Sequence, residues 1–128
     1  MRLIFDTHTL LWIVTNDSKL SKKAKSLFLN SKNEILFSFA GIWEMAIKIN
    51  LGRLSIDQSL KEFIKHHIKG NDIKLLSIEL NHILLLENLP QHHRNPFDRF
   101  LICQAIAENI PIISSDKDLD LYTIKRIW

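Results

Sequence analysis

The feature that most constrains this chain is an alternation between short apolar runs and longer stretches with helical periodicity. The pattern predicts strands at residues 2–5, 34–37, 74–76, 111–114 and 124–127. It predicts helices at residues 7–15, 21–30, 38–50, 57–68, 78–87 and 96–108, and a short helix or turn at residues 116–122. Because strands separated by helices pair in parallel through right-handed crossovers, we expect a parallel sheet.

The strand-like runs are mostly apolar instead of alternating between apolar and polar residues. They read Leu-Ile-Phe, Ile-Leu-Phe, Lys-Leu-Leu and Pro-Ile-Ile. A sheet that is covered on both faces needs such runs. We therefore expect the α/β class, with a three-layer α/β/α sandwich around a small, mostly parallel sheet. The chain has 128 residues with no repeat or linker, which predicts a single domain over residues 1–128.

Residues at the edges of the helical patterns predict where several helices begin and end. Ser77 precedes an apolar-periodic stretch and is an expected N-cap. The run Ser-Ile-Asp-Gln at residues 55–58 has the form of a capping box that opens the fourth helix. Gly52 is expected to stop the third helix, and Asn95 followed by Pro96 is expected to begin the last long one.

Composition excludes several classes of protein. No stretch approaches the ~18 consecutive apolar residues of a membrane span. Asp6 and His8 interrupt the first apolar run, so we do not expect a signal peptide. Cys103 is the only cysteine, which excludes an internal disulfide and fits a cytoplasmic location. Lys and Arg number 17 against 14 Asp and Glu, a net charge of +3 that permits a polyanionic partner without requiring one.

Four acidic residues stand apart from the ordinary surface acids. Asp6 and Asp116 directly follow the first and fourth strands. If those strands are neighbours, ~4.8 Å apart, the two carboxylates face each other. Glu44 lies inside the apolar run Ile-Trp-Glu-Met-Ala-Ile, and Asp98 lies in the first turn of the last long helix. In a parallel α/β sheet, functional groups gather beyond the carboxyl ends of the strands.

Each of these acids also has an ordinary structural interpretation. Asp6 and Asp116 are each suited to cap the helix that follows. Glu44 could pair with Lys48, which lies one helical turn further on. Asp98 occupies a position where an acid favours the helix dipole.

Four carboxylates at one edge would repel one another. At ~5 Å and an effective dielectric constant of ~20, each pair costs about 3 kcal/mol. A bound Mg²⁺ or Mn²⁺ would offset this repulsion, since both ions prefer oxygen ligands. Such an ion can bind a phosphate oxygen and activate water, which suits hydrolysis of a phosphodiester. Zinc is not expected, because the histidines lack ligand spacing, and we expect both adjacent pairs at the surface: His66, His67, His92 and His93.

Five stretches of the sequence match a known family in the order in which that family has them. They begin at residues 5 (Phe-Asp-Thr-His-Thr-Leu-Leu-Trp), 42 (Ile-Trp-Glu-Met-Ala-Ile-Lys), 51 (Leu-Gly-Arg-Leu), 95 (Asn-Pro-Phe-Asp-Arg) and 114 (Ser-Ser-Asp). With these stretches the chain resembles the PIN-domain nucleases, and within them the VapC-like toxins of bacterial toxin–antitoxin pairs. The resemblance spans nearly the whole chain.

The resemblance implies a Mg²⁺- or Mn²⁺-dependent endoribonuclease. The residues that match the family's catalytic, metal-binding acids are Asp6, Glu44, Asp98 and Asp116. Ser114 matches the Ser or Thr that supports the site. Many relatives have Asp where this chain has Asn95, so we assign that position to structure. Asp118 and Asp120 are further candidates for the fourth ligand.

The resemblance also implies three partners: an RNA substrate, a cognate antitoxin that covers the acidic groove, and a second copy in a homodimer. The basic residues that could hold the RNA backbone by charge are Arg99, Lys48, Arg94 and Lys117. The aromatic residues that could stack on bases, although such residues usually pack in the core, are Trp12, Trp43 and Phe97. Candidates for the apolar walls of an antitoxin groove are Leu10, Leu11, Trp12 and Trp43.

Two other functions stay open. A haloacid-dehalogenase-like phosphatase also begins with a strand followed by an acid. That class requires Asp-x-Asp-x-Thr, however, and here His8 stands where the second acid is needed. The other alternative is a non-catalytic RNA- or protein-binding module on the same fold, which the presence of all four acids argues against.

Overall fold

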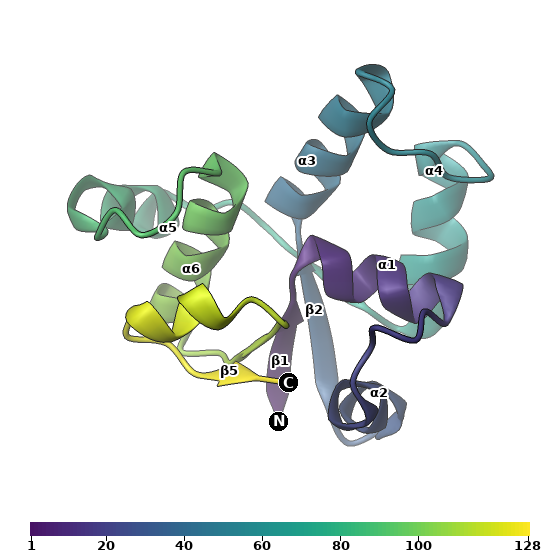
Figure 1. Ribbon diagram of the computed structural model, residues 1–128, viewed down its shortest axis with the longest axis horizontal. Coiled ribbons are helices and arrows are strands. Elements are labelled where there is room, and N and C mark those ends of the chain that lie inside the picture. Colours follow the sequence, from purple (N-terminus) through teal and green to yellow (C-terminus); the bar gives the residue numbers. More distant parts are fainter.

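A computed structural model describes residues 1–128 and has a five-stranded sheet at its centre (Figure 1). The strands are β1 (Arg2–Phe5), β2 (Glu34–Ser38), β3 (Lys74–Leu76), β4 (Ile112–Ile113) and β5 (Arg126–Ile127). Their order is β3-β2-β1-β4-β5, and every neighbouring pair is parallel. The predicted α/β sandwich is therefore confirmed, with a sheet that is entirely parallel.

Helices cover both faces of this sheet. The α-helices are α1 (Thr7–Thr15), α2 (Lys22–Leu29), α3 (Phe39–Asn50), α4 (Leu60–Phe63), α5 (Leu80–Leu84) and α6 (Pro96–Glu108). The shorter helical turns are η1 (Ile64–Ile68), η2 (Lys69–Asn71), η3 (Leu85–Asn88) and η4 (Lys117–Leu121). In Figure 1, α1, α2 and α4 lie to one side of the strands, α5 and α6 lie to the other, and α3 rises beyond the ends of β1 and β2. No helix combines the length and the apolar character that crossing a membrane would require.

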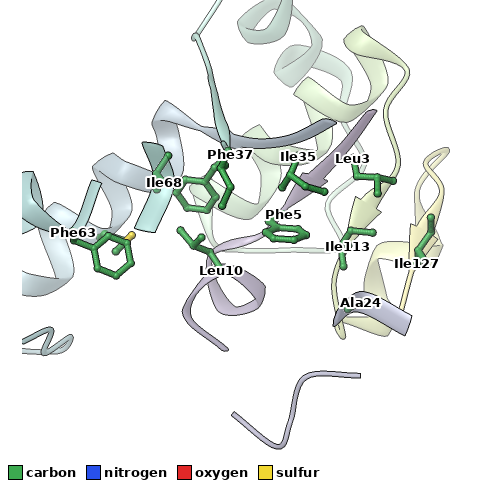
Figure 2. Packing of buried hydrophobic residues seen from close by; sticks show 12 residues of the cluster. Leu3, Phe5, Leu10, Ala24, Ile35, Phe37, Phe63, Ile68, Ile113 and Ile127 are labelled. Carbon is green, nitrogen blue, oxygen red and sulfur yellow. The ribbon is translucent and has the colours of Figure 1, made fainter. Parts of the chain in front are cut away.

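Two hydrophobic clusters, one on each face of the sheet, make up the core. Leu3 and Phe5 of β1 point into the cluster beneath α1 and α2, where they pack with Phe37 of β2 (Figure 2). Ile4, between them in sequence, belongs to the opposite cluster, together with Ile102 of α6. Successive strand residues are thus buried on opposite faces, which is why the strand runs do not alternate in polarity.

The predicted start of the fourth helix is wrong. Residues 55–58 do not form a capping box, and α4 begins at Leu60. Its N-cap is Ser59, whose Oγ accepts the Glu62 N–H at 3.1 Å. The half-buried Ile56 packs against the first hydrophobic cluster between the exposed Ser55 and Asp57, and the helix begins only after this segment.

The fifth helix also differs from the prediction. It begins at Leu80 after an N-cap at Glu79, so Ser77 is not the cap. The buried imidazole of His82 accepts the Glu79 N–H at 3.1 Å, and the Gln104 amide donates to the Ser77 carbonyl at 3.3 Å. Because these contacts hold Ser77 outside the helix, α5 begins two residues later than predicted. The predicted stop at Gly52 agrees with the end of α3 at Asn50, and Gly52 has the positive φ of 72° that favours glycine.

Candidate active site

The carboxyl edge of the sheet carries a small cavity of about 20 Å³, enough for one water-sized molecule. The residues around it are Phe5, Asp6, Thr7, Phe37, Ser38, Ala40, Gly41, Glu44, Phe97, Asp98 and Leu101. They come from the ends of β1 and β2 and from the first two turns of α1, α3 and α6. Three of the four predicted acids, Asp6, Glu44 and Asp98, therefore meet at one cavity.

Asp6 is held in place by hydrogen bonds from α1 and from the residue that follows β4. It follows β1 as the N-cap of α1, and its Oδ1 accepts the Thr9 N–H at 2.9 Å and the Thr9 hydroxyl at 2.6 Å. The Ser114 hydroxyl, just after β4, donates to Oδ2. Because β1 and β4 are neighbours, Ser114 reaches Asp6 although 108 residues separate them in sequence.

Glu44 is a buried acid with three donors. Its side chain in α3 is 7% exposed. The Thr7 hydroxyl donates to Oε1 at 2.8 Å, and the Asn95 amide donates to Oε2 at 3.3 Å. The Lys48 ammonium also lies 3.1 Å from Oε2. The sequence offers two interpretations of Glu44, as a partner of Lys48 and as a member of the acidic site. In the structure Glu44 is both.

Asp98 is the acid of the site whose negative charge has no hydrogen-bond donor in the protein. The first turn of α6 is capped by Asn95, whose Oδ1 accepts the N–H groups of Phe97 and Asp98 at 2.8 and 3.3 Å. The Asp98 carboxylate itself has no hydrogen-bond partner in the protein. Burial raises its pKa from 3.8 to about 6, and the charge of Glu44 adds to this rise. Smaller contributions come from Asp6 and Asp116, which raise the pKa further, and from His93, which lowers it.

Asp116 lies beside the cavity, at the N-cap of η4. Its Oδ1 accepts the Asp118 N–H at 3.0 Å, and its Oδ2 is 2.7 Å from the His93 Nε2. Its own N–H donates to the Ser114 hydroxyl at 3.1 Å, so Ser114 connects Asp116 to Asp6.

The two further acids of this segment differ from Asp116. Asp120 forms a two-pronged ion pair with Arg126, at 3.0 Å for each contact, and this pair holds its pKa below the usual value. The Asp118 side chain is exposed, and only its backbone N–H contacts Asp116. Neither residue lines the acidic cavity.

His93 is a site residue that the sequence analysis missed. We expected both His pairs at the surface, and His66 and His92 are exposed. The His93 side chain, however, is only 9% exposed and contacts both Asp116 and Tyr122. Two adjacent histidines in a polar loop give no periodic signal, and the contact with Tyr122 spans 29 residues. Its position two residues before Asn95, the cap of α6, was the only clue in the sequence.

The four predicted basic residues occupy different environments. Lys48 pairs with Glu44, whereas Arg94 and Lys117 are exposed. The Arg99 guanidinium donates to the backbone carbonyls of the loop before α6, namely those of Leu89, Pro90 and His93, at 3.2, 2.9 and 3.4 Å. Arg94 and Arg99 also line a polar hollow of about 520 Å³ at the surface. Arg99 thus holds a loop in addition to contributing charge.

The carboxylates fit a hard divalent cation with few protein ligands. No three Asp, Glu, His or Cys side chains are arranged to hold one ion as they stand. Mg²⁺, however, keeps several waters and usually binds only one or two carboxylates. The unpartnered carboxylate of Asp98, in a cavity shared with Asp6 and Glu44, supplies oxygen donors of that kind. Asp98 and Asp6 are the residues best placed to hold such an ion.

An apolar groove of about 490 Å³ lies next to the acidic cavity. Its walls are Ala40, Trp43, Ile47, Ile78, Ile83, Leu86, Pro96, Phe97 and Phe100. Trp43 is 58% exposed and makes an edge-to-face contact with Phe97 at 5.3 Å between ring centroids. Because Ala40 and Phe97 line both hollows, the groove and the acidic cavity are contiguous.

The other residues predicted for an apolar wall lie elsewhere. Leu10 is fully buried in the core beneath α1, and Leu11 packs against that same cluster. Trp12 contacts Trp128 at 5.8 Å between ring centroids. Of the four candidates, Trp43 alone lines this groove.

The parallel sheet and the acids at its carboxyl edge define a class of α/β protein with a carboxylate site. The chain belongs to the PIN domain family, whose model matches residues 3–125. Its fold is similar to that of a chain in the crystal structure of VapBC2 from Rickettsia felis bound to a DNA fragment from their promoter. That similarity has a TM-score of 0.75 at 12% sequence identity and covers 100% of this chain and 99% of that chain. A comparison with curated proteins finds no match.

Proposed function

We propose that this protein is a Mg²⁺- or Mn²⁺-dependent endoribonuclease that acts in the cytoplasm as the toxin of a toxin–antitoxin pair. PIN domains are generally nucleases, and those nucleases generally use divalent metal ions. The observation that carries the proposal is the Asp98 carboxylate, which has no donor of its own and shares a cavity with Asp6 and Glu44. A bound cation would offset the burial and the repulsion by Glu44 that together raise the pKa of Asp98.

The residues of the cavity have distinct roles in this proposal. Asp98 and Asp6 bind the cation, and Asp116 presents a further carboxylate to it from beside the cavity. Thr9 and Ser114 keep Asp6 in one orientation through their hydroxyl groups. Glu44 adds negative charge from a position fixed by Thr7. When bound, the divalent ion polarises a phosphate oxygen and provides an activated water.

Basic residues close to the acidic edge supply the charge that would hold RNA. Lys48, Arg94 and Lys117 reach the surface with at least part of their side chains, and the charge of Arg99 adds to the hollow that it shares with Arg94. Contacts of this kind go to phosphates and position the backbone without reading its bases. We therefore expect the affinity for RNA to fall steeply with salt.

A protein partner is part of the proposal. The VapBC2 structure, which is similar in fold, contains two components bound to promoter DNA. By analogy, we propose that this chain binds a cognate antitoxin and forms a homodimer. The apolar groove beside the acidic cavity, with the exposed Trp43, gives an antitoxin segment a place to dock next to the carboxylates.

The proposal is tested by sequencing RNA ends after the intact protein is expressed in cells. We expect new, discrete cleavage sites that disappear in Asp6→Asn. The matched control is Asp57→Asn, because Asp57 is exposed and remote from the acidic cavity, and it should leave cleavage unchanged. The same RNA ends with and without Asp6 would contradict a nuclease and favour a non-catalytic binding module.

A further inference from the structure

We infer that His93 is a positioning residue of the site, because its imidazole connects Tyr122 to Asp116 and fixes the orientation of that carboxylate. The inference rests on the proposed function, since it concerns how Asp116 faces the cation. It assigns a role to a side chain whose place in the sequence, in a polar loop after His92, suggests only surface exposure.

The imidazole is held at both of its nitrogens. Nε2 lies 2.7 Å from the Asp116 Oδ2, and Nδ1 lies 3.0 Å from the Tyr122 hydroxyl. The two rings of His93 and Tyr122 also contact each other, with 5.4 Å between their centroids. With 9% of its side chain exposed, the imidazole has little freedom to turn towards solvent.

The hydrogen bonds around Tyr122 favour one tautomer of the His93 ring. The His92 backbone N–H donates to the Tyr122 hydroxyl oxygen at 3.2 Å. A phenol has a single hydrogen, and the remaining neighbour able to accept it is the His93 Nδ1. If the Tyr122 hydroxyl donates to Nδ1, the ring proton that faces Asp116 is on Nε2 and is donated to its Oδ2. This tautomer follows from the network and is therefore open to direct observation.

Asp116 consequently has one donor on each oxygen. Oδ1 accepts the Asp118 N–H at 3.0 Å, and Oδ2 accepts the His93 Nε2–H. Two donors on opposite oxygens prevent the carboxylate from rotating, while each oxygen keeps a free lone pair. Hydrogen-bond partners that orient a metal-binding carboxylate in this way typically contribute 10- to 100-fold to metal affinity or activity.

The supports of His93 are themselves anchored in the fold. Tyr122 is 7% exposed and belongs to the hydrophobic cluster beneath α6. Arg99, in α6, donates to the His93 carbonyl at 3.4 Å and holds the loop that carries it. The imidazole is thus oriented before any ligand arrives, so its contribution should be measurable in the metal-free protein as well as in the loaded one.

Three variants separate positioning from a structural contribution. His93→Ala removes the donor, His93→Gln restores an amide N–H at a similar reach, and Tyr122→Phe removes the hydroxyl that fixes the tautomer. His66→Ala is the matched control, because His66 is an exposed histidine that contacts Glu62 and Gln58 and none of the four acids of the site. Mn²⁺ affinity is measured by calorimetry, cleavage by kcat on RNA, and the imidazole tautomer by ¹⁵N NMR of the metal-free protein.

We expect the metal-free wild type to show His93 protonated at Nε2, and Tyr122→Phe to lose that single tautomer. His93→Ala should weaken Mn²⁺ binding and lower kcat by about 10- to 100-fold, whereas His93→Gln should recover part of both. A His93→Ala protein that binds Mn²⁺ and cleaves RNA like the wild type, or a wild type protonated at Nδ1, would overturn the inference. A wild type that neither binds Mn²⁺ nor cleaves RNA would instead overturn the proposed function.

Discussion

At the residue scale, the raised pKa of Asp98 makes the stability of the metal-free protein depend on pH. Its carboxylate is half-buried without a hydrogen-bond donor, and Glu44 lines the same cavity. The sequence alone could not separate capping from chemistry at this position, because both favour an acid in the first turn of a helix. In the structure Asn95 supplies the cap, which leaves the Asp98 carboxylate free for a ligand.

The first prediction concerns the stability of Asp98→Asn without metal. The folded pKa of about 6 lies above the ordinary value of 3.8, so the folded state binds this proton more tightly than the unfolded state. The contribution of this carboxyl group to wild-type stability should therefore be lost as the pH rises from about 4 to 6, and it should stay lost above that range. At pH 7.5 the shift corresponds to about 3 kcal/mol at most, and to about 1–2 kcal/mol once solvent screening is included.

This prediction is checked by urea unfolding in EDTA at pH 4 and pH 7.5. We expect Asp98→Asn to be more stable than the wild type at pH 7.5 and nearly equal to it at pH 4. A wild type that is the more stable protein at pH 7.5 without metal would show that its Asp98 carboxylate is compensated by contacts within the chain.

At the element scale, most of the architecture could be predicted from periodicity, whereas exact helix starts could not. The strand runs and six helical segments are local patterns, and the parallel order explains why Asp6 and Ser114 meet. The starts of α4 and α5 depend on Ile56 packing in the core and on the buried imidazole of His82. Neither tertiary contact has a signal in the sequence around it.

The second prediction concerns the packing of α3 on the sheet. A Cβ added to Gly41 would lie 2.5 Å from Cζ of Phe37, a ring that is 1% exposed and cannot move aside. Gly41→Ala should destabilise the protein by about 1–3 kcal/mol from overpacking, in spite of the ~1 kcal/mol that alanine gains in a helix.

Thermal unfolding of Gly41→Ala measures this effect, and Gly70→Ala serves as its control. A Cβ at Gly70 meets only the Lys65 carbonyl at 3.4 Å, so that variant should unfold close to the wild-type temperature. A Gly41→Ala variant that is at least as stable as the wild type would contradict the close packing of α3 on Phe37.

The third prediction concerns Asn95, which joins the cap of α6 to Glu44. Asn95→Asp keeps an acceptor for the helix N–H groups but replaces the amide that donates to Glu44 with a like charge. In EDTA this variant should be less stable than the wild type, and added Mn²⁺ should stabilise it more than it stabilises the wild type. Asn95→Ala should lose about 1 kcal/mol through the missing cap and a further amount through the lost donor to Glu44. Because it adds no charge, its extra response to Mn²⁺ should be smaller than that of Asn95→Asp.

Chemical unfolding of both Asn95 variants, with EDTA and with Mn²⁺, provides the measurement. Equal stabilisation of Asn95→Asp, Asn95→Ala and the wild type by Mn²⁺ would mean that this position has no part in the balance of charge around the cavity.

At the scale of the whole molecule, the parallel topology gathers residues from distant parts of the chain at one edge. Asp6 follows β1, and Asp98 lies in the first turn of α6 more than ninety positions later, yet both line one cavity. That edge could be predicted, because parallel strands end together. The side-chain network could not, since the contacts of Glu44 with Asn95 and of His93 with Asp116 depend on where loops return to the sheet.

The fourth prediction is that a divalent cation stabilises the entire fold. At a Mn²⁺ concentration of about 100 times Kd, the gain in free energy of unfolding is about 2.7 kcal/mol, which for a domain of this size is on the order of 10 °C in melting temperature. Thermal melts with Mn²⁺, Mg²⁺ and EDTA measure the gain. The rise should vanish in Asp98→Asn and persist in Asp57→Asn, and an equal rise in both variants would place the binding elsewhere.

Anomalous X-ray diffraction from crystals soaked in Mn²⁺ tests the central claim most directly. We expect a manganese peak in the cavity bounded by Asp6, Glu44 and Asp98, within coordination distance of an Asp98 oxygen, and no such peak in crystals of Asp98→Asn. Ordered crystals without a peak in that cavity, from wild-type protein that cleaves RNA in Mn²⁺ buffer, would contradict an acidic metal site at the carboxyl edge of the sheet.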